Sequence, residues 1–155
     1  MGCDIHMFTE QKNKENIWEN ADHFTRNTSN QDAYQVDDEK MKGWNRIAIA
    51  DERNYLLFGM LAGVRRDPEG HFVPKGMPSD ASEITQSEFE AMGGDAHTPS
   101  WLTIPEIEQK KWDADSNQLS RLLEQLETHF KSKWNFVDYD DKYKERCRIV
   151  FWFDN

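Results

Sequence analysis

Two segments of the chain each place an aspartate two residues before a histidine. Asp4 and His6 stand in the opening residues MGCDIHMFTE, and Asp95 and His97 stand in the segment DAHTPSWL. Residues two apart in a strand point to the same side, so each carboxylate would lie close to its imidazole. Such a pair can bind a divalent metal ion, or the carboxylate can orient the imidazole as a general acid or base.

Both pairs also have a purely structural interpretation. Asp4 and His6 can form a hydrogen-bonded pair within a partly buried sheet, and Asp95 can bond the backbone of its own loop, as in an Asx turn. The second pair stands between Gly-Gly and Pro, which predicts a loop, and loops on a rigid scaffold are where binding and catalytic groups concentrate. The residues alone leave these alternatives open.

Three further residues have side chains suited to a phosphate-bearing ligand. Arg53 and Asn54 fall in the expected first turn of a helix, where the helix dipole does not favour a cation. The position of Arg53 therefore predicts one of two contacts: a salt bridge to a carboxylate such as Asp4 or Asp95, or a contact with a ligand phosphate at the helix start. Trp101 can stack on a base, or it can pack at the rim of the core.

The elements that must position these residues show strand patterns at both ends of the chain. Alternation predicts a strand over 4–10, with Cys3, Ile5 and Met7 facing the core and with Asp4 and His6 on the opposite face. Residues 17–19 predict its hairpin partner. The segment 147–153 is apolar on both sides, which indicates a central strand.

Helix patterns fill the middle of the chain. Four helices are expected: one over 52–64 capped by Asp51, one over 81–92 capped by Asp80, one from Thr103 with Glu106 in a capping box, and one over 116–133. Arg65 and Arg66 are interpreted as charges at the end of the first helix. His129 lies beside the apolar stripe of the fourth, where a structural or exposed position is expected.

Together these patterns predict one α+β domain over residues 1–155. A small, mostly antiparallel sheet that includes both terminal strands packs against about four helices. The polar, aperiodic segment 25–42 predicts a surface loop within that domain.

Composition and charge narrow the classes of partner. The formal net charge is -10, which argues against binding to duplex DNA but leaves room for a small anion in a local basic pocket. No stretch is long and apolar enough for a membrane span, and no export leader is recognised, so we expect a cytoplasmic protein. Cys3 and Cys147 are then expected to be reduced thiols.

The order of segments MGCDIH, RNYLLFGMLAGVR, GMPSD and DAHTPSWL resembles a family of small phage and prophage proteins. The resemblance marks seven positions for a site: Asp4, His6, Arg53, Asn54, Asp95, His97 and Trp101. It implies a protein that works in the cytoplasm of an infected bacterial host. Phage proteins of this size often counter host defences by binding or cleaving cyclic nucleotide signals.

Three hypotheses of function follow. The first is a hydrolase for a phosphodiester-containing, cyclic nucleotide signal, in which Asp4, His6, Asp95 and His97 bind a divalent metal or act as acid and base. Arg53 with Asn54 would hold the phosphate, and Trp101 would stack. The second is a non-catalytic sponge for the same ligands, possibly a homo-oligomer. The third is an acidic inhibitor of a host nucleic-acid-binding protein.

Overall fold

The first and last strands of the chain pair with each other along almost their whole length. In the computed structural model, which describes residues 2–26, 34–35, 44–50, 53–114, 117–133 and 139–155, β1 (Asp4–Lys12) runs antiparallel to β7 (Cys147–Asp154). The register extends from Asp4 opposite Asp154 to Gln11 opposite Cys147. The predicted pairing of the terminal strands is thus confirmed.

Two further strands complete the main sheet. β2 (Trp18–Asn20) pairs with β1 as the predicted hairpin, and β6 (His97–Thr103) pairs with the other side of β7, giving the order β2-β1-β7-β6. A second, three-stranded sheet has the order β3-β5-β4. Its strands are β3 (His23–Arg26), β5 (Trp44–Ile47) and β4 (Tyr34–Gln35).

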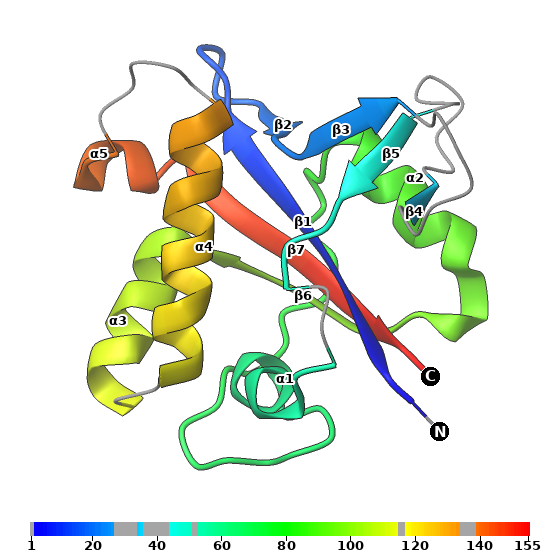
Figure 1. The fold of residues 1–155 in the computed structure, drawn as a ribbon, viewed down its shortest axis with the longest axis vertical. Coiled ribbons are helices and arrows are strands. Elements are labelled where there is room, and N and C mark those ends of the chain that lie inside the picture. The colour runs from blue at the N-terminus through cyan, green and yellow to red at the C-terminus, as the bar shows by residue number, and fades with distance from the viewer. Residues whose placement is uncertain (1, 27–33, 36–43, 51–52, 115–116, 134–138) are drawn as a thin grey trace.

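Other elements cover both faces of the main sheet (Figure 1). The helices are α1 (Tyr55–Ala62), α2 (Glu83–Met92), α3 (Ile104–Ala114), α4 (Asn117–Lys133) and the short α5 (Asp141–Lys144), with a 3-10 turn at Gly93–Asp95. Helices α1, α3 and α4 pack on one face, and α2 and the second sheet lie on the other. The predicted α+β class is therefore confirmed.

The alternation of β1 and β7 explains this double cover. Cys3, Ile5 and Met7 are buried in the main core beneath the helices, as predicted. Phe8 and Trp152 are buried on the other face, where the Trp152 ring meets the edge of Phe89 from α2 at 5.2 Å between centroids. Because β7 is apolar on both sides, it can lie at the centre of the molecule.

Two helix starts differ from the prediction. Asp51 lies outside the described residues, and the cap of α1 is Asn54, whose Oδ1 accepts a hydrogen bond from the Leu57 amide. Ser82, rather than Asp80, caps α2 by accepting from the Thr85 amide. Each true cap stands nearer to the first apolar turn than the acidic residue that was predicted.

The capping box of α3 is confirmed. The Thr103 amide donates to Glu106 Oε1 at 3.1 Å, and the Glu106 amide donates to Thr103 Oγ1 at 3.4 Å. This box satisfies two backbone donors at the helix start and fixes where β6 ends.

The predicted loop over 25–42 is wrong at residues 25–26 and 34–35, which lie in strands. Residues 25–26 belong to β3 and residues 34–35 form β4, while 27–33 and 36–43 lie outside the described residues.

The two cysteines are free thiols at opposite ends of the β1–β7 ladder, as expected. None of the helices in the described ranges has the length and apolar character needed to span a bilayer.

Candidate functional site

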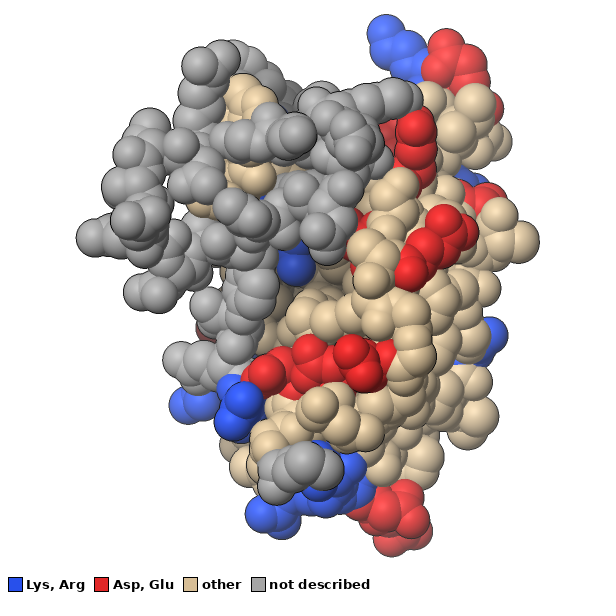
Figure 2. Space-filling model, turned by 90° about the vertical axis from the view of Figure 1, so that its right-hand side faces the viewer, with Lys and Arg blue, Asp and Glu red and all other residues tan. Residues whose placement is uncertain are grey.

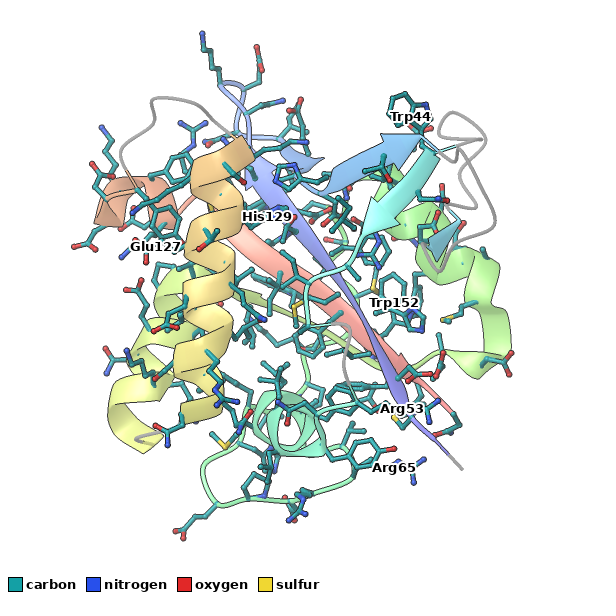
Figure 3. All side chains as sticks on the ribbon, viewed as in Figure 1. Trp44, Arg53, Arg65, Glu127, His129 and Trp152 are labelled. Atoms are coloured by element: carbon teal, nitrogen blue, oxygen red, sulfur yellow. The ribbon has the colours of Figure 1, made fainter. Side chains whose placement is uncertain are left out.

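Four charged or titratable side chains meet where β1 begins and β7 ends. We call Asp4, His6, Arg53 and Asp154 the sheet-end cluster. Arg53 Nε donates to Asp4 Oδ1 at 2.6 Å, and its Nη2 donates to Asp4 Oδ2 at 3.2 Å. His6 Nε2 lies 2.8 Å from Asp154 Oδ2. Arg53 therefore makes the salt bridge to Asp4 that was one of its two predicted roles (Figure 3).

The Asp4–Arg53 pair is open to solvent. The hydrogen bond from Arg53 holds the pKa of Asp4 below its ordinary value, against a smaller opposing effect of burial. Because the two side chains are 40% and 58% exposed, water and salt screen their attraction, so the pair contributes little stability. Because Arg53 remains accessible to solvent, another anion can replace Asp4 as its partner.

His6 is held from two sides. Its ring stacks near-parallel on Trp152, with 6.1 Å between centroids, and Asp154 bonds its Nε2. A carboxylate that fixes an imidazole in this way is the arrangement found in general acid and base sites. The orienting carboxylate is Asp154, however, and not Asp4, which was the predicted partner.

The second Asp-x-His pair lies in a different environment. The segment predicted as a loop is instead the 3-10 turn and edge strand β6, because residue 97 and residues 100–103 pair with β7. His97 Nδ1 lies 3.0 Å from Thr98 Oγ1, and its buried Nε2 has no partner among the described residues. Asp95 is exposed in the turn.

The two pairs do not converge. The His97 ring stacks on Phe153, which packs against Phe58 of α1, whereas His6 stacks on Trp152 beneath α2. Adjacent residues of a strand face opposite sides, so His6 and His97 lie on opposite faces of the main sheet. Within the described ranges, no group of three or more His, Cys, Asp or Glu side chains is arranged to hold a metal ion.

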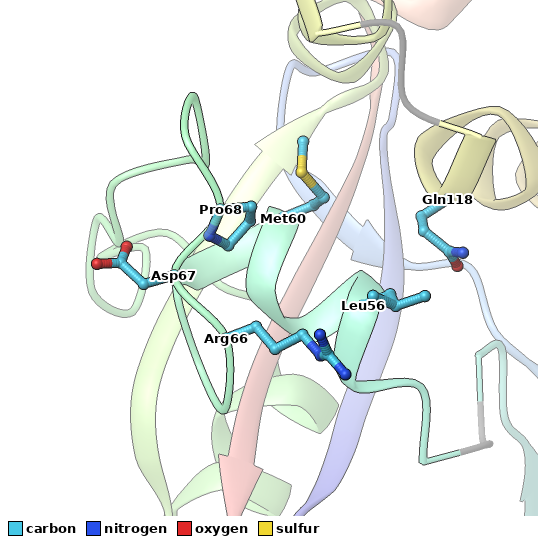
Figure 4. Close-up of a pocket in the computed structure, with 6 residues that line it drawn as sticks. All are labelled: Leu56, Met60, Arg66, Asp67, Pro68 and Gln118. Atoms are coloured by element: carbon cyan, nitrogen blue, oxygen red, sulfur yellow. The ribbon is translucent and has the colours of Figure 1, made fainter.

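A cleft between α1 and α4 brings in Asn54 and residues that were not predicted. Its larger part has a volume of about 500 Å³ and is lined by Leu56, Met60, Arg66, Asp67, Pro68 and Gln118 (Figure 4). An adjoining cavity of about 140 Å³ shares Gln118 and is lined also by Ala50, Asn54, Leu57, Arg121, Leu122 and Gln125. We call the two together the helix cleft.

Local backbone geometry forms the wall of this cleft. Helix α1 ends at Gly63, whose φ of 69° is in the left-handed region that favours glycine. The chain then returns along the helix, and a Cβ on Gly59 would lie 2.9 Å from Arg66 Cβ and 3.1 Å from Pro68 Cδ. Close approach at Gly59 thus places the 66–68 segment against α1.

Two arginines of the helix cleft have free guanidinium groups. Arg66 and Arg121 are exposed, and neither makes an ion pair or hydrogen bond within the part of the chain that the structure describes. Arg66 was interpreted as a charge at the end of a helix, but α1 ends four residues earlier, at Ala62. One signal in the sequence could have marked Arg66 as a candidate site residue: an arginine beyond the end of a helix is not stabilised there by the helix dipole.

Amides connect the two sides of the cleft. Asn54 Nδ2 donates to Gln118 Oε1 at 2.7 Å, while Asn54 Oδ1 caps α1. Asn54 precedes the helix rather than lying in its first turn, and Arg53 lies one residue further out. The segment 53–54 therefore extends from the sheet-end cluster to the helix cleft.

Trp101 lies away from both sites. Lys75 Nζ is 3.6 Å from the centre of its ring, and the guanidinium of Arg148 is 5.3 Å away. Arg148 is itself buried, and its Nε donates to Glu10 Oε1 at 2.8 Å. The ring of Trp101 thus contacts two cationic side chains and belongs to neither site.

A buried histidine network also resembles a catalytic arrangement. His129 Nε2 lies 3.0 Å from Thr9 Oγ1 and 2.8 Å from the Ala21 carbonyl, and Thr9 Oγ1 donates to Asp22 Oδ1 at 2.8 Å (Figure 3). The carbonyl can only accept, so Nε2 carries the proton and cannot take one from the threonine. This network is structural, which agrees with one of the two expectations for His129.

The face of the molecule in Figure 2 carries separate acidic and basic side chains among uncharged ones, without a continuous basic surface over its described residues.

Comparison with protein-family models, with curated proteins and with solved structures finds no match to this chain. Function must therefore be argued from the geometry of the clusters and cavities themselves.

Proposed function

We propose that the chain binds a small nucleotide, a cyclic signal of an infected bacterial host, in the helix cleft and does not cleave it. The observation that carries this proposal is a free guanidinium group in each part of the cleft, Arg66 beside the apolar wall of the larger part and Arg121 in the adjoining cavity. The formal net charge of the chain is -10, so two cations that no described carboxylate neutralises make the helix cleft locally more positive than the protein as a whole.

The lining of the cleft fits both halves of a nucleotide. Leu56, Met60 and Pro68 provide an apolar wall for a base, and a volume of about 500 Å³ is in the range of small-molecule sites. Arginine binds phosphate oxygens through two parallel hydrogen bonds. Gln118 carries an amide that can donate to a base edge and accept from it.

The lining of the cleft favours binding over hydrolysis, because it offers few side chains that could act as general acid or base. Among its described lining residues there is one carboxylate, Asp67, and no histidine. Asp67 Oδ1 is bonded to His71 Nε2 at 2.9 Å. The Asp67–His71 pair beside the cleft has both imidazole nitrogens bonded, Nε2 to Asp67 and Nδ1 to the Phe72 carbonyl, so it leaves no imidazole nitrogen free to act on a bound phosphate.

A panel of cyclic mononucleotides, cyclic dinucleotides and cyclic ADP-ribose isomers tests this proposal. We expect the protein to deplete one ligand from solution and to release it intact after heat denaturation, as measured by liquid chromatography. Arg66→Gln with Arg121→Gln should weaken binding at least about tenfold, since two charge-assisted contacts are lost.

A charge-matched variant controls for the general electrostatic field. Lys110→Gln with Lys131→Gln also removes two positive charges, but both lysines lie outside the helix cleft. Its affinity should stay within about twofold of the parent. If no ligand of the panel is depleted, or if both double variants weaken binding equally, the proposal is wrong.

Hydrolysis is the second candidate, and the His6–Asp154 pair beside Arg53 favours it. New products in the same chromatogram, lost in His6→Gln, would assign cleavage to the sheet-end cluster. Products that persist with a chelator would indicate acid–base catalysis, and products lost with it would indicate a metal. The inhibitor hypothesis rests on net charge alone.

A further inference from the structure

A second pocket, of about 400 Å³, lies between the β1–β2 hairpin and α5. Three of its lining residues are cationic, Lys12, Lys14 and Arg146, whereas Glu19 is its one carboxylate within the described lining. Glu19 Oε1 already accepts a hydrogen bond from Asn13 Nδ2 at 2.8 Å. The pocket is thus a local concentration of positive charge on an acidic protein, and such a field attracts anions.

Arg146 is fixed in place by the hairpin. Its Nη2 donates to the carbonyl oxygens of Lys12, at 2.8 Å, and Asn13, at 2.5 Å, and the Lys12 amide donates to the Arg146 carbonyl at 2.9 Å. These bonds hold the guanidinium without neutralising it, because every acceptor is an uncharged carbonyl. A fixed cation loses little conformational freedom when an anion binds.

Hydrogen-bonding capacity in the pocket wall remains unused. Arg146 Nε, Gln11 Oε1 and Tyr143 Oη are each buried without a hydrogen-bond partner among the described residues. Native proteins satisfy most such groups with protein, ordered water or ligand. Burial raises the pKa of Tyr143 above its ordinary value, so its hydroxyl stays neutral.

The role of Arg146 in the hairpin does not explain the two lysines. Lys14 is exposed and forms no ion pair within the described ranges. Lys12 Nζ lies 5.2 Å from the centre of the Trp18 ring, a contact that leaves its charge without a counter-ion. A hairpin stabilised by Arg146 alone would not need either charge.

We propose that this pocket binds the phosphate group of a small phosphomonoester, independently of the helix cleft. Lys12, Lys14 and Arg146 would neutralise the dianion, and the remaining volume would hold the organic part. The volume is larger than a phosphate ion needs and lies in the range of small-molecule sites. A phosphomonoester should therefore bind more tightly than free phosphate.

Titration of the full chain with phenyl phosphate, and separately with inorganic phosphate, tests the proposal by two-dimensional NMR of backbone amides. We expect saturable shifts in the hairpin, over residues 11–20, and at residues 143–146. Phenyl phosphate should bind at least about threefold more tightly than inorganic phosphate, because its ring buries apolar area. Equal affinity for both probes would assign the site to free phosphate and would overturn the phosphomonoester proposal.

Variants separate the charges from the fold. Lys12→Gln with Lys14→Gln should weaken phenyl phosphate binding at least about fivefold, and Lys110→Gln with Lys131→Gln should leave it within about twofold. Arg146→Lys keeps a charge and should retain part of the affinity. The proposal fails if both double variants bind alike, or if the shifts spread over the surface without saturating.

The two proposals fail separately. Nucleotide binding in the helix cleft would shift amides of residues 54–60 and 118–125, and phosphomonoester binding would shift those of the hairpin. Loss of one set of shifts with retention of the other identifies which site is wrong.

Discussion

Glu10 and Arg148 form an ion pair that is almost completely withdrawn from water. Their side chains are 0% and 1% exposed, and Arg148 Nη2 lies 2.7 Å from Glu10 Oε1. Arg148 Nη1 also bonds Asp80 Oδ1 at 3.0 Å, and Glu10 Oε2 accepts from the Ser82 amide at 2.7 Å. The pair therefore joins the main sheet to the start of α2, and it cannot be removed one charge at a time without a large cost.

Replacing Arg148 by methionine should lower the free energy of unfolding by about 3–5 kcal/mol, because Glu10 is left buried without a counter-charge. The double variant Glu10→Gln with Arg148→Met should regain part of that loss. Urea denaturation of the three proteins measures both effects. If the single and double variants are equally destabilised, the loss comes from packing and not from the uncompensated charge.

His129 gives the fold a dependence on pH. Burial lowers its pKa from the ordinary histidine value, with His23 and Lys133 acting in the same direction and Asp22 and the Ala21 carbonyl opposing them. The neutral ring is favoured in the fold, so the unfolded chain binds more protons as the pH falls below the ordinary value of about 6.5. Stability is present above that value and is lost on acidification.

The variant His129→Gln should therefore show a shallower fall in the free energy of unfolding between pH 7.5 and 5.5, at the expense of lower stability at pH 7.5. Other titrating groups are common to both proteins, so the difference between the two pH profiles reports His129 together with its electrostatic coupling to His23 and Asp22. Parallel profiles would show that His129 takes up no proton on unfolding in this range.

At the scale of elements, periodicity predicted what depends on local sequence. Alternation placed Cys3, Ile5 and Met7 toward the core, and the capping box at Thr103 marked the start of α3. The segment from Asp95 to Trp101 was misread as a loop because Gly93-Gly94 precedes it and Pro99 interrupts it. Its pairing with β7 is a long-range contact that local propensity does not contain.

The candidate site was less predictable than the fold for a related reason. Two Asp-x-His pairs look equivalent in the sequence, yet one lies on β1 while the other runs from the 3-10 turn into β6, and the two histidines face opposite sides of one sheet. The partner of His6 is Asp154, which is 148 residues away. Spacing along the chain predicts neighbours within an element, but only the register between strands determines which elements bring their side chains together.

At the scale of the whole molecule, β7 makes one folding unit of two packed layers. Ile149 faces the helices and Val150 faces the second sheet and α2, and both are fully buried. Neither layer can lose β7 and remain covered, so we expect the two layers to unfold together rather than in sequence.

Substitutions at these adjacent positions test that coupling. Ile149→Val should cost about 1 kcal/mol and Val150→Ala about 2 kcal/mol, from the lost methyl groups and the cavities they leave. Native-state hydrogen exchange should show the same decrease for the slowest amides of α4, on one face, and of α2, on the other. If Val150→Ala loosens α2 alone while α4 keeps its protection, the layers unfold independently. In a two-layer molecule joined by one central strand, destabilisation on either face is instead transmitted through β7 to both.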